Sequence, residues 1–120
     1  MWPFTERRRR KRKAVLWEAD VHCSPVGQTE HLQAQVTEIS LHGARILLGR
    51  MHLRSYHLMV SNNPDDLELA IHLPEGIVRS KIIIRWYNRQ EGEQLFTVGI
   101  EFCDMPEGGQ NLLKEKIKNL

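Results

Sequence analysis

Apolar and polar residues alternate along most of this 120-residue chain. Because successive side chains of a strand point to opposite faces, this pattern predicts strands with one buried face and one exposed face. It predicts six strands, at residues 14–23, 31–41, 43–48, 67–73, 77–88 and 95–103. Turn-forming stretches such as "SPVGQTE" and "SNNPDD" separate them, whereas the segment 50–61 is ambiguous.

The period of the pattern changes near the C-terminus. After Pro106, apolar residues recur near helical spacing, with lysines late in the segment: Leu112, Leu113, Ile117 and Leu120. We therefore expect an all-β protein, a six-stranded antiparallel Greek-key-type β-barrel with a C-terminal helix at about 107–119. The length predicts one domain, residues 14–120, preceded by an arm at residues 1–13.

The arm holds the basic character of the protein. Residues 6–13, "ERRRRKRK", contain seven of the 17 Lys and Arg residues, which leaves ten basic and fourteen acidic residues elsewhere. A block of like charges repels itself and has little to bury, so we expect the arm to be flexible when it is alone. The arm favours an anionic ligand. The acidic remainder counts against a nucleic-acid-binding protein, which usually spreads basic residues over one face.

Several other classes of protein lack support in the sequence. No apolar run approaches the ~20 residues that a bilayer span needs, and no signal-peptide core follows the basic stretch. Cys23 and Cys103 are far apart without a CxxC spacing, which indicates reduced thiols and a cytoplasmic protein. Phosphate-binding loops and catalytic motifs are missing, so we expect neither an enzyme nor a cofactor.

The histidines and large aromatic residues suggest no site of their own. The six histidines stand without a Cys or carboxylate at metal-ligand spacing, so we expect no metal site; they are His22, His31, His42, His52, His57 and His72. Trp17, Trp86 and Tyr87 are interpreted as aromatic residues of the core or the rim of the barrel, with base stacking as the alternative.

The stretch "TEISLHGARI", residues 37–46, combines groups that can bind a nucleobase. Strand alternation places Glu38 and Ser40 on one face, and Gly43 permits either a turn with positive φ or close approach of a ligand to the backbone. A carboxylate can accept both the N1–H and the 2-amino group of guanine. A plain junction between a strand and a turn would give the same short pattern, so the stretch is not decisive by itself.

Together with the arm, this stretch resembles the signature of the PilZ domain family. That signature is RxxxR just before the first strand and [D/N]xSxxG about 25 residues later; here Arg8 and Arg12 precede Glu38, Ser40 and Gly43. The strands "IIIRW" and "VGIEF" fit the same family. The resemblance implies a β-barrel that acts as a bacterial receptor for cyclic di-GMP, and it implies these five residues as the ligand-binding site.

Two details refine this expectation. The family has Asp or Asn where this chain has Glu38, whose extra methylene moves the carboxylate by ~1.5 Å. In the family the residue before RxxxR resembles a selector of stoichiometry, and a basic residue there implies an intercalated pair of nucleotides. That residue is Arg7, so we expect two cyclic di-GMP molecules per chain, with Arg7 as a sixth ligand-binding residue.

Three functions remain open at this point. The first is a cyclic di-GMP receptor that acts as an adaptor and signals to an unidentified protein partner in motility, exopolysaccharide or pilus control, with residues 50–61 as the expected partner-binding segment. The second is a PilZ-like interaction domain without a nucleotide. The third is a nucleic-acid-binding protein that uses the basic arm, which would show steep dependence on salt.

Overall fold

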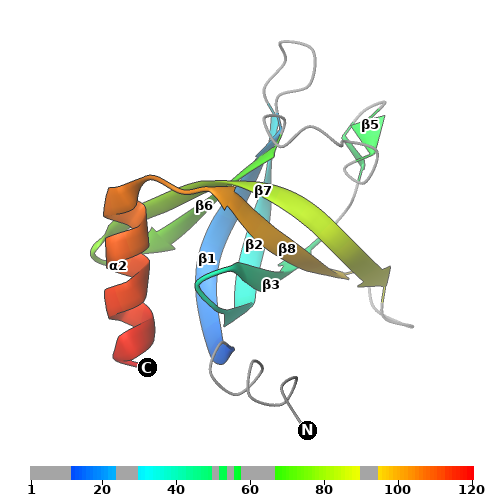
Figure 1. The fold of residues 1–120 in the computed structure, drawn as a ribbon. Coiled ribbons are helices and arrows are strands. Elements are labelled where there is room, and N and C mark those ends of the chain that lie inside the picture. The colour runs from blue at the N-terminus through cyan, green and yellow to red at the C-terminus, as the bar shows by residue number, and fades with distance from the viewer. Residues whose placement is uncertain (1–11, 24–29, 50–51, 54–55, 58–66, 90–94) are drawn as a thin grey trace, which may run out of the picture.

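The computed structural model describes residues 12–23, 30–49, 52–53, 56–57, 67–89 and 95–120 of the chain (Figure 1). Within them, six longer strands are β1 (Lys13–Cys23), β2 (Glu30–Ile39), β3 (Gly43–Leu48), β6 (Leu67–Leu73), β7 (Gly76–Arg89) and β8 (Phe96–Asp104). The short strands β4 (His52–Leu53) and β5 (Tyr56–His57) pair with each other, and α2 (Glu107–Lys118) follows β8.

The six longer strands form a closed antiparallel barrel in the order β1-β2-β3-β8-β7-β6. Two three-strand meanders, β1 to β3 and β6 to β8, are joined along both of their edges. This arrangement confirms the six-stranded antiparallel barrel with a C-terminal helix that the alternation predicted. Closure gives partners to the backbone N–H and C=O groups that would otherwise be unpaired at the edges of an open sheet.

The barrel interior holds the core. The inward-facing side chains alternate along each strand with exposed ones, as in β1, where Ala19, Val21 and Cys23 are buried. The largest buried side chains come from strands on all sides of the barrel and from α2: Ile39, Ile46, Leu48, Leu69, Ile71, Ile82 and Leu113. Burial of such aliphatic side chains contributes about 1.5–3 kcal/mol each, so the core is the main source of stability.

Helix α2 packs against β7 beside the barrel (Figure 1). Leu113 is the fully buried contact of the helix, and basic residues in its last turn suit the negative end of the helix dipole. Lys116 donates a hydrogen bond to Glu75 at 2.9 Å, and this hydrogen bond holds the pKa of that carboxyl below its ordinary value. The helix lies against the start of β7, where Leu112 is near Gly76 and Gly109 is near Val78, and Arg85 and Trp86 are farther along the same strand.

The element boundaries differ from the predicted ones by small amounts. β1 begins at Lys13, which the pattern assigned to the arm, and β2 ends at Ile39 instead of residue 41. The ambiguous segment 50–61 contains the short β4–β5 pair. Arm residues 1–11 lie outside the described residues.

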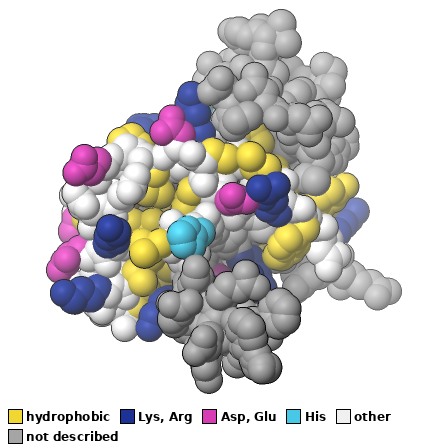
Figure 2. Space-filling view, viewed as in Figure 1, with side chains coloured by type: hydrophobic (Ala, Val, Ile, Leu, Met, Phe, Trp, Pro, Cys, Tyr) yellow, Lys and Arg dark blue, Asp and Glu magenta, His cyan; other side chains and the backbone are white. Residues whose placement is uncertain are grey.

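Both signs of charge are mixed on the described surface. Figure 2 shows one face on which acidic and basic side chains are interspersed and hydrophobic side chains are visible between them. Among the residues that the structure describes, no helix has the length and hydrophobicity that a transmembrane segment requires.

Candidate functional site

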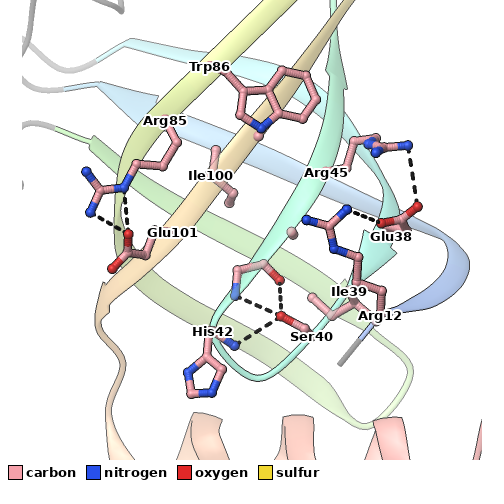
Figure 3. Close-up of a pocket in the computed structure, with 13 residues that line it drawn as sticks. Arg12, Glu38, Ile39, Ser40, His42, Arg45, Arg85, Trp86, Ile100 and Glu101 are labelled. Carbon is pink, nitrogen blue, oxygen red and sulfur yellow. Dashed lines mark hydrogen bonds and ion pairs between the residues drawn. The ribbon is translucent and has the colours of Figure 1, made fainter. Parts of the chain in front are cut away.

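An open pocket of about 640 Å³ lies where the start of β1 and the β2–β3 turn meet the β7–β8 pair (Figure 3). This volume is in the range of ~300–1,000 Å³ that is typical of small-molecule sites. Most of the lining residues are polar or glycine, and the set comprises Arg12, Glu38, Ile39, Ser40, His42, Gly43, Ala44, Arg45, Arg85, Trp86, Gly99, Ile100 and Glu101.

The structure brings Arg12 to the predicted motif. Because β1 and β2 are antiparallel, the start of β1 lies beside the end of β2, and Lys13 pairs with Ile39. Arg12 therefore reaches Glu38, with 3.5 Å between Nη1 and Oε1. Arg7 and Arg8, the other predicted arginines, lie outside the described residues.

A β-bulge gives Glu38 a second arginine partner. Val36 pairs with Ile46, and continuing that register would place Glu38 opposite Ala44. The register shifts by one residue, so that Glu38 lies opposite Arg45 instead, and Nη1 of Arg45 is 3.4 Å from Oε2 of Glu38. Bulges re-aim side chains in this way beside binding sites.

Arg45 links the carboxylate to the aromatic part of the pocket. Its guanidinium carbon lies 5.8 Å from the centroid of the Trp86 ring, within the range of a cation–π contact. Its Nε is buried and has no hydrogen-bond partner among the described residues. Arg45 therefore lies between Glu38 and Trp86 with donor capacity that the described residues leave unused.

Ser40 shapes the turn between β2 and β3. Its Oγ accepts hydrogen bonds from the backbone N–H groups of His42 and Gly43, each at 3.2 Å, and donates one to the Gly43 carbonyl oxygen at 3.2 Å. The backbone N–H of Ser40 also donates to that oxygen at 2.9 Å. The hydroxyl is thus engaged with the turn, and its first role is to hold the backbone at the pocket.

Gly43 is required by the neighbouring strand. A Cβ at this position would overlap the carbonyl oxygen of Ile100 on β8. Of the two possibilities that the sequence left open, the positive φ is not adopted, since among the described glycines only Gly76 has one. The second possibility, a close approach to the backbone of Gly43, is present, and the approaching group is the backbone of β8 at Ile100.

A second bulge places Trp86 in the pocket. Ile84 pairs with Ile100, but Trp86 pairs with Gly99, so that Arg85 is the extra residue of β7. A Cβ at position 99 would overlap the indole of Trp86, which shows that Gly99 makes room for the ring. Trp86 remains 42% exposed, so a face of the ring is available to a ligand. The interpretation of Trp86 as a rim aromatic agrees with this position.

The β7–β8 side of the pocket carries an ion pair that the sequence did not reveal. Arg85 donates from Nε to Oε1 of Glu101 at 2.6 Å, and its Nη2 contacts the same oxygen. Figure 3 shows this pair on the side of the pocket opposite Glu38, Arg45 and Arg12, with Ile100 between the two sides. Alternation within a single strand shows neither the bulges nor which strands are paired. The sequence therefore did not point to Arg45, Arg85 or Glu101.

These groups suit an anion that carries aromatic rings. Guanidinium groups bind phosphates or the acceptor edge of a purine, carboxylates accept from amide-like N–H groups, and an exposed indole stacks on a base. The described residues contain no group of three or more potential ligands that could hold a metal ion. Cys103 lies near Glu101 at this side of the barrel. Burial raises the pKa of its thiol, and the Glu101 carboxylate adds to this effect, so the thiol is not activated as a nucleophile.

The fold is a closed six-stranded β-barrel with an open pocket that arginine and glutamate side chains line. The family model of the PilZ domain matches residues 6–119. The chain therefore belongs to the PilZ domain family, a family of cyclic di-GMP receptors.

Among solved structures, that of the Bacillus subtilis inhibitor of motility MotI/DgrA is similar to this chain. It has a TM-score of 0.61 at 17% sequence identity, and the match covers 92% of this chain and 51% of that chain. The likeness shows a shared fold, and this chain spans about half the length of that protein. None of the curated proteins matches the chain.

Proposed function

We propose that this protein binds cyclic di-GMP in the pocket between the β2–β3 turn and the β7–β8 pair. One observation carries the proposal: Arg12, Glu38, Ser40 and Gly43, which are 31 residues apart at their extremes, line the same open pocket. These are the described members of the motif that resembles the PilZ signature. The arm residues Arg7 and Arg8 complete the proposed site.

Each group has a chemical role toward this ligand. The guanidinium groups of Arg8, Arg12 and Arg45 meet phosphate oxygens or the O6/N7 edge of guanine, which a planar guanidinium binds in bidentate fashion. Glu38 accepts from guanine N1–H and the 2-amino group. Trp86 offers its exposed face for stacking on a base.

When the ligand binds, the arginine and glutamate side chains of this site exchange their ion-pair partners for groups of the nucleotide. In the structure, both oxygens of Glu38 are paired with arginines, and the Glu38 side chain is 27% exposed. The nucleotide supplies two phosphates for the arginines and a guanine edge for the carboxylate, so that every charged group keeps a partner. Because the ligand is anionic and the arm brings a cluster of cations to it, affinity should fall as ionic strength rises.

The proposed stoichiometry is two nucleotides per chain. An intercalated pair of cyclic di-GMP molecules brings four phosphates into one site, and the arm has the extra cations to meet them. Arg7 is the proposed selector. Titration at a protein concentration well above Kd should break at two equivalents, and a break at one that is unchanged in Arg7→Leu would remove this role from Arg7.

Isothermal titration of the full chain with cyclic di-GMP tests the binding function. Arg8→Ala and Arg12→Ala should each weaken binding by about 1.5–3 kcal/mol, the usual contribution of a charge-assisted hydrogen bond. Arg10→Ala and Lys13→Ala serve as controls and should weaken binding far less. Absence of binding by the unmodified protein, or an equal loss in all four variants, would contradict a motif-based site.

The proposed output is a change in affinity for a protein partner, so that the chain acts as an adaptor in motility, exopolysaccharide or pilus control. Two observations support this proposal: the chain belongs to the PilZ domain family, and it has an open pocket lined by arginine, glutamate and tryptophan side chains. Co-purification of partners with and without cyclic di-GMP would identify the output. A partner that is recovered equally with and without the nucleotide, and equally by Arg12→Ala, would contradict control by the nucleotide.

A further inference from the structure

The pocket has a second carboxylate–guanidinium pair, Arg85 with Glu101, that belongs to neither motif. Both side chains are about half exposed, at 56% and 45%. Exposed ion pairs contribute little to stability because water screens them and ordering two long side chains costs entropy. A contribution to stability therefore does not explain an ion pair at this position, whereas a contact with a ligand in the pocket would explain it.

The position of Glu101 connects the pair to the motif. In the β3–β8 pairing Glu101 lies directly opposite Gly43, and in the β7–β8 pairing it lies opposite Ile83. The absence of a side chain at Gly43 leaves Glu101 without a bulky neighbour on the motif side. Arg85 is the extra residue of the bulge in β7 and lies two residues beyond Ile83, the residue opposite Glu101.

The pocket thus has a similar set of groups on two opposing sides (Figure 3). One side presents Glu38 with Arg45, and the other presents Glu101 with Arg85. Cyclic di-GMP has two guanines with identical edges. Each guanine offers N1–H and its 2-amino group to a carboxylate on its Watson–Crick edge, and O6 and N7 to a guanidinium on its Hoogsteen edge.

We infer that Arg85 and Glu101 form a second guanine-recognition site of this pocket and determine its selectivity for guanine over adenine. The inference rests on the proposed function. Adenine lacks the N1–H and 2-amino donors and carries a 6-amino donor in place of O6, so it leaves a carboxylate and a guanidinium without matched partners. Trp86 lines the same pocket with an exposed ring, and we expect it to stack on one of the bound bases.

Paired titrations with cyclic di-GMP and the mixed cyclic GMP–AMP dinucleotide test this inference on the full chain. The unmodified protein should prefer cyclic di-GMP by about tenfold or more, since one base is mismatched in the mixed ligand. In Glu101→Gln this preference should fall to about one or reverse, because a glutamine amide is the usual partner of adenine. Arg85→Gln should also reduce the preference, through loss of the donors to O6 and N7.

Glu68→Gln is the matched control. Glu68 forms a similarly exposed ion pair with Arg79 on β6 and β7, at 3.4 Å and away from the pocket. This variant should keep the preference of the unmodified protein, and all three variants should retain its thermal midpoint because the pairs are exposed.

The outcomes separate the inference from the proposed function. A protein that binds cyclic di-GMP but whose preference changes less than twofold in both Glu101→Gln and Arg85→Gln overturns the inference and leaves the function intact. An equal loss for both ligands in these variants also overturns it, because a general electrostatic role does not distinguish the bases. If the unmodified protein does not bind cyclic di-GMP, the proposed function fails and the inference fails with it.

Discussion

The two sides of the pocket are built in different ways. On the β2–β3 side, Ser40 is hydrogen-bonded to the turn and Gly43 lies against the backbone of β8. On the β7–β8 side, Arg85 and Glu101 interact through exposed side chains. One side is thus determined by backbone geometry and the other by side-chain chemistry.

This difference predicts which properties mutations will affect. Changes at the β2–β3 turn alter the position of the backbone, so stability and ligand affinity should fall together. Changes on the β7–β8 side alter the surface that the ligand meets, so affinity should fall while stability is nearly retained. The ratio of these two losses is therefore a measure of how each residue acts.

Gly43→Val should have the largest effect. The added side chain overlaps the carbonyl oxygen of Ile100, so β3 and β8 must move apart. Overpacking of this kind costs about 1–3 kcal/mol, and the pocket between these strands changes shape as well. Gly49→Val is the control, since a Cβ at Gly49 has nothing within 4 Å. Denaturant unfolding and titration with cyclic di-GMP measure both losses; equal stability of the two variants would contradict the role of Gly43.

Trp86→Ala should weaken cyclic di-GMP binding by about 1–3 kcal/mol if a base stacks on the indole. Its effect on unfolding should be smaller than that of Gly43→Val, because the ring is 42% exposed. Tyr87→Ala, a neighbour of similar exposure outside the pocket lining, is the control. Similar affinity losses in the two variants would exclude a stacking role for Trp86.

Ser40→Ala should lower the free energy of unfolding by about 1 kcal/mol, the usual effect of losing a hydrogen-bonding group. Affinity should fall in parallel, because the N–H groups of His42 and Gly43 lose their acceptor and the turn moves. Thermal unfolding beside titration separates two roles for the hydroxyl. A tenfold loss of affinity at unchanged stability would show that Ser40 contacts the ligand directly.

Glu38→Asp should have the smallest effect. It restores the residue that the family signature has at this position, and the ion pairs with Arg12 and Arg45 that it alters are already long, at 3.5 and 3.4 Å, and partly exposed. We expect affinity for cyclic di-GMP to stay unchanged or improve, by less than about 1 kcal/mol. A tenfold weaker titration curve would mean that the pocket is adapted to the longer side chain.

Much of the fold was predictable because it depends on local patterns. Period-two alternation located the six barrel strands to within a few residues, and the helical period located α2. The structure places Arg12 beside the "TEISLHGARI" stretch, since antiparallel pairing brings the start of β1 to the end of β2.

Side-chain roles within the motif were harder to predict. The stretch alone was compatible with a plain junction between a strand and a turn, and only the resemblance to the PilZ signature implied that Ser40 and Gly43 contact a ligand. The structure shows that both residues have partners within the protein, Ser40 in its own turn and Gly43 at Ile100. A pattern of residue types does not show which neighbour uses a hydroxyl or requires the absence of a Cβ.

The sequence by itself determined the strands, the helix, the order of the motifs and the charge of the arm, because each depends on residues close together in the chain. Only the tertiary structure decided the opposing side of the pocket, formed by Arg85, Trp86 and Glu101, and the pairing of Arg45 with Glu38. The pairing of Arg45 with Glu38 and of Trp86 with Gly99 results from bulges, which shift the register by one residue and so change which distant side chain is adjacent. Alternation within one strand is nearly the same with or without such a shift, and the pairing of the two strands sets the neighbours.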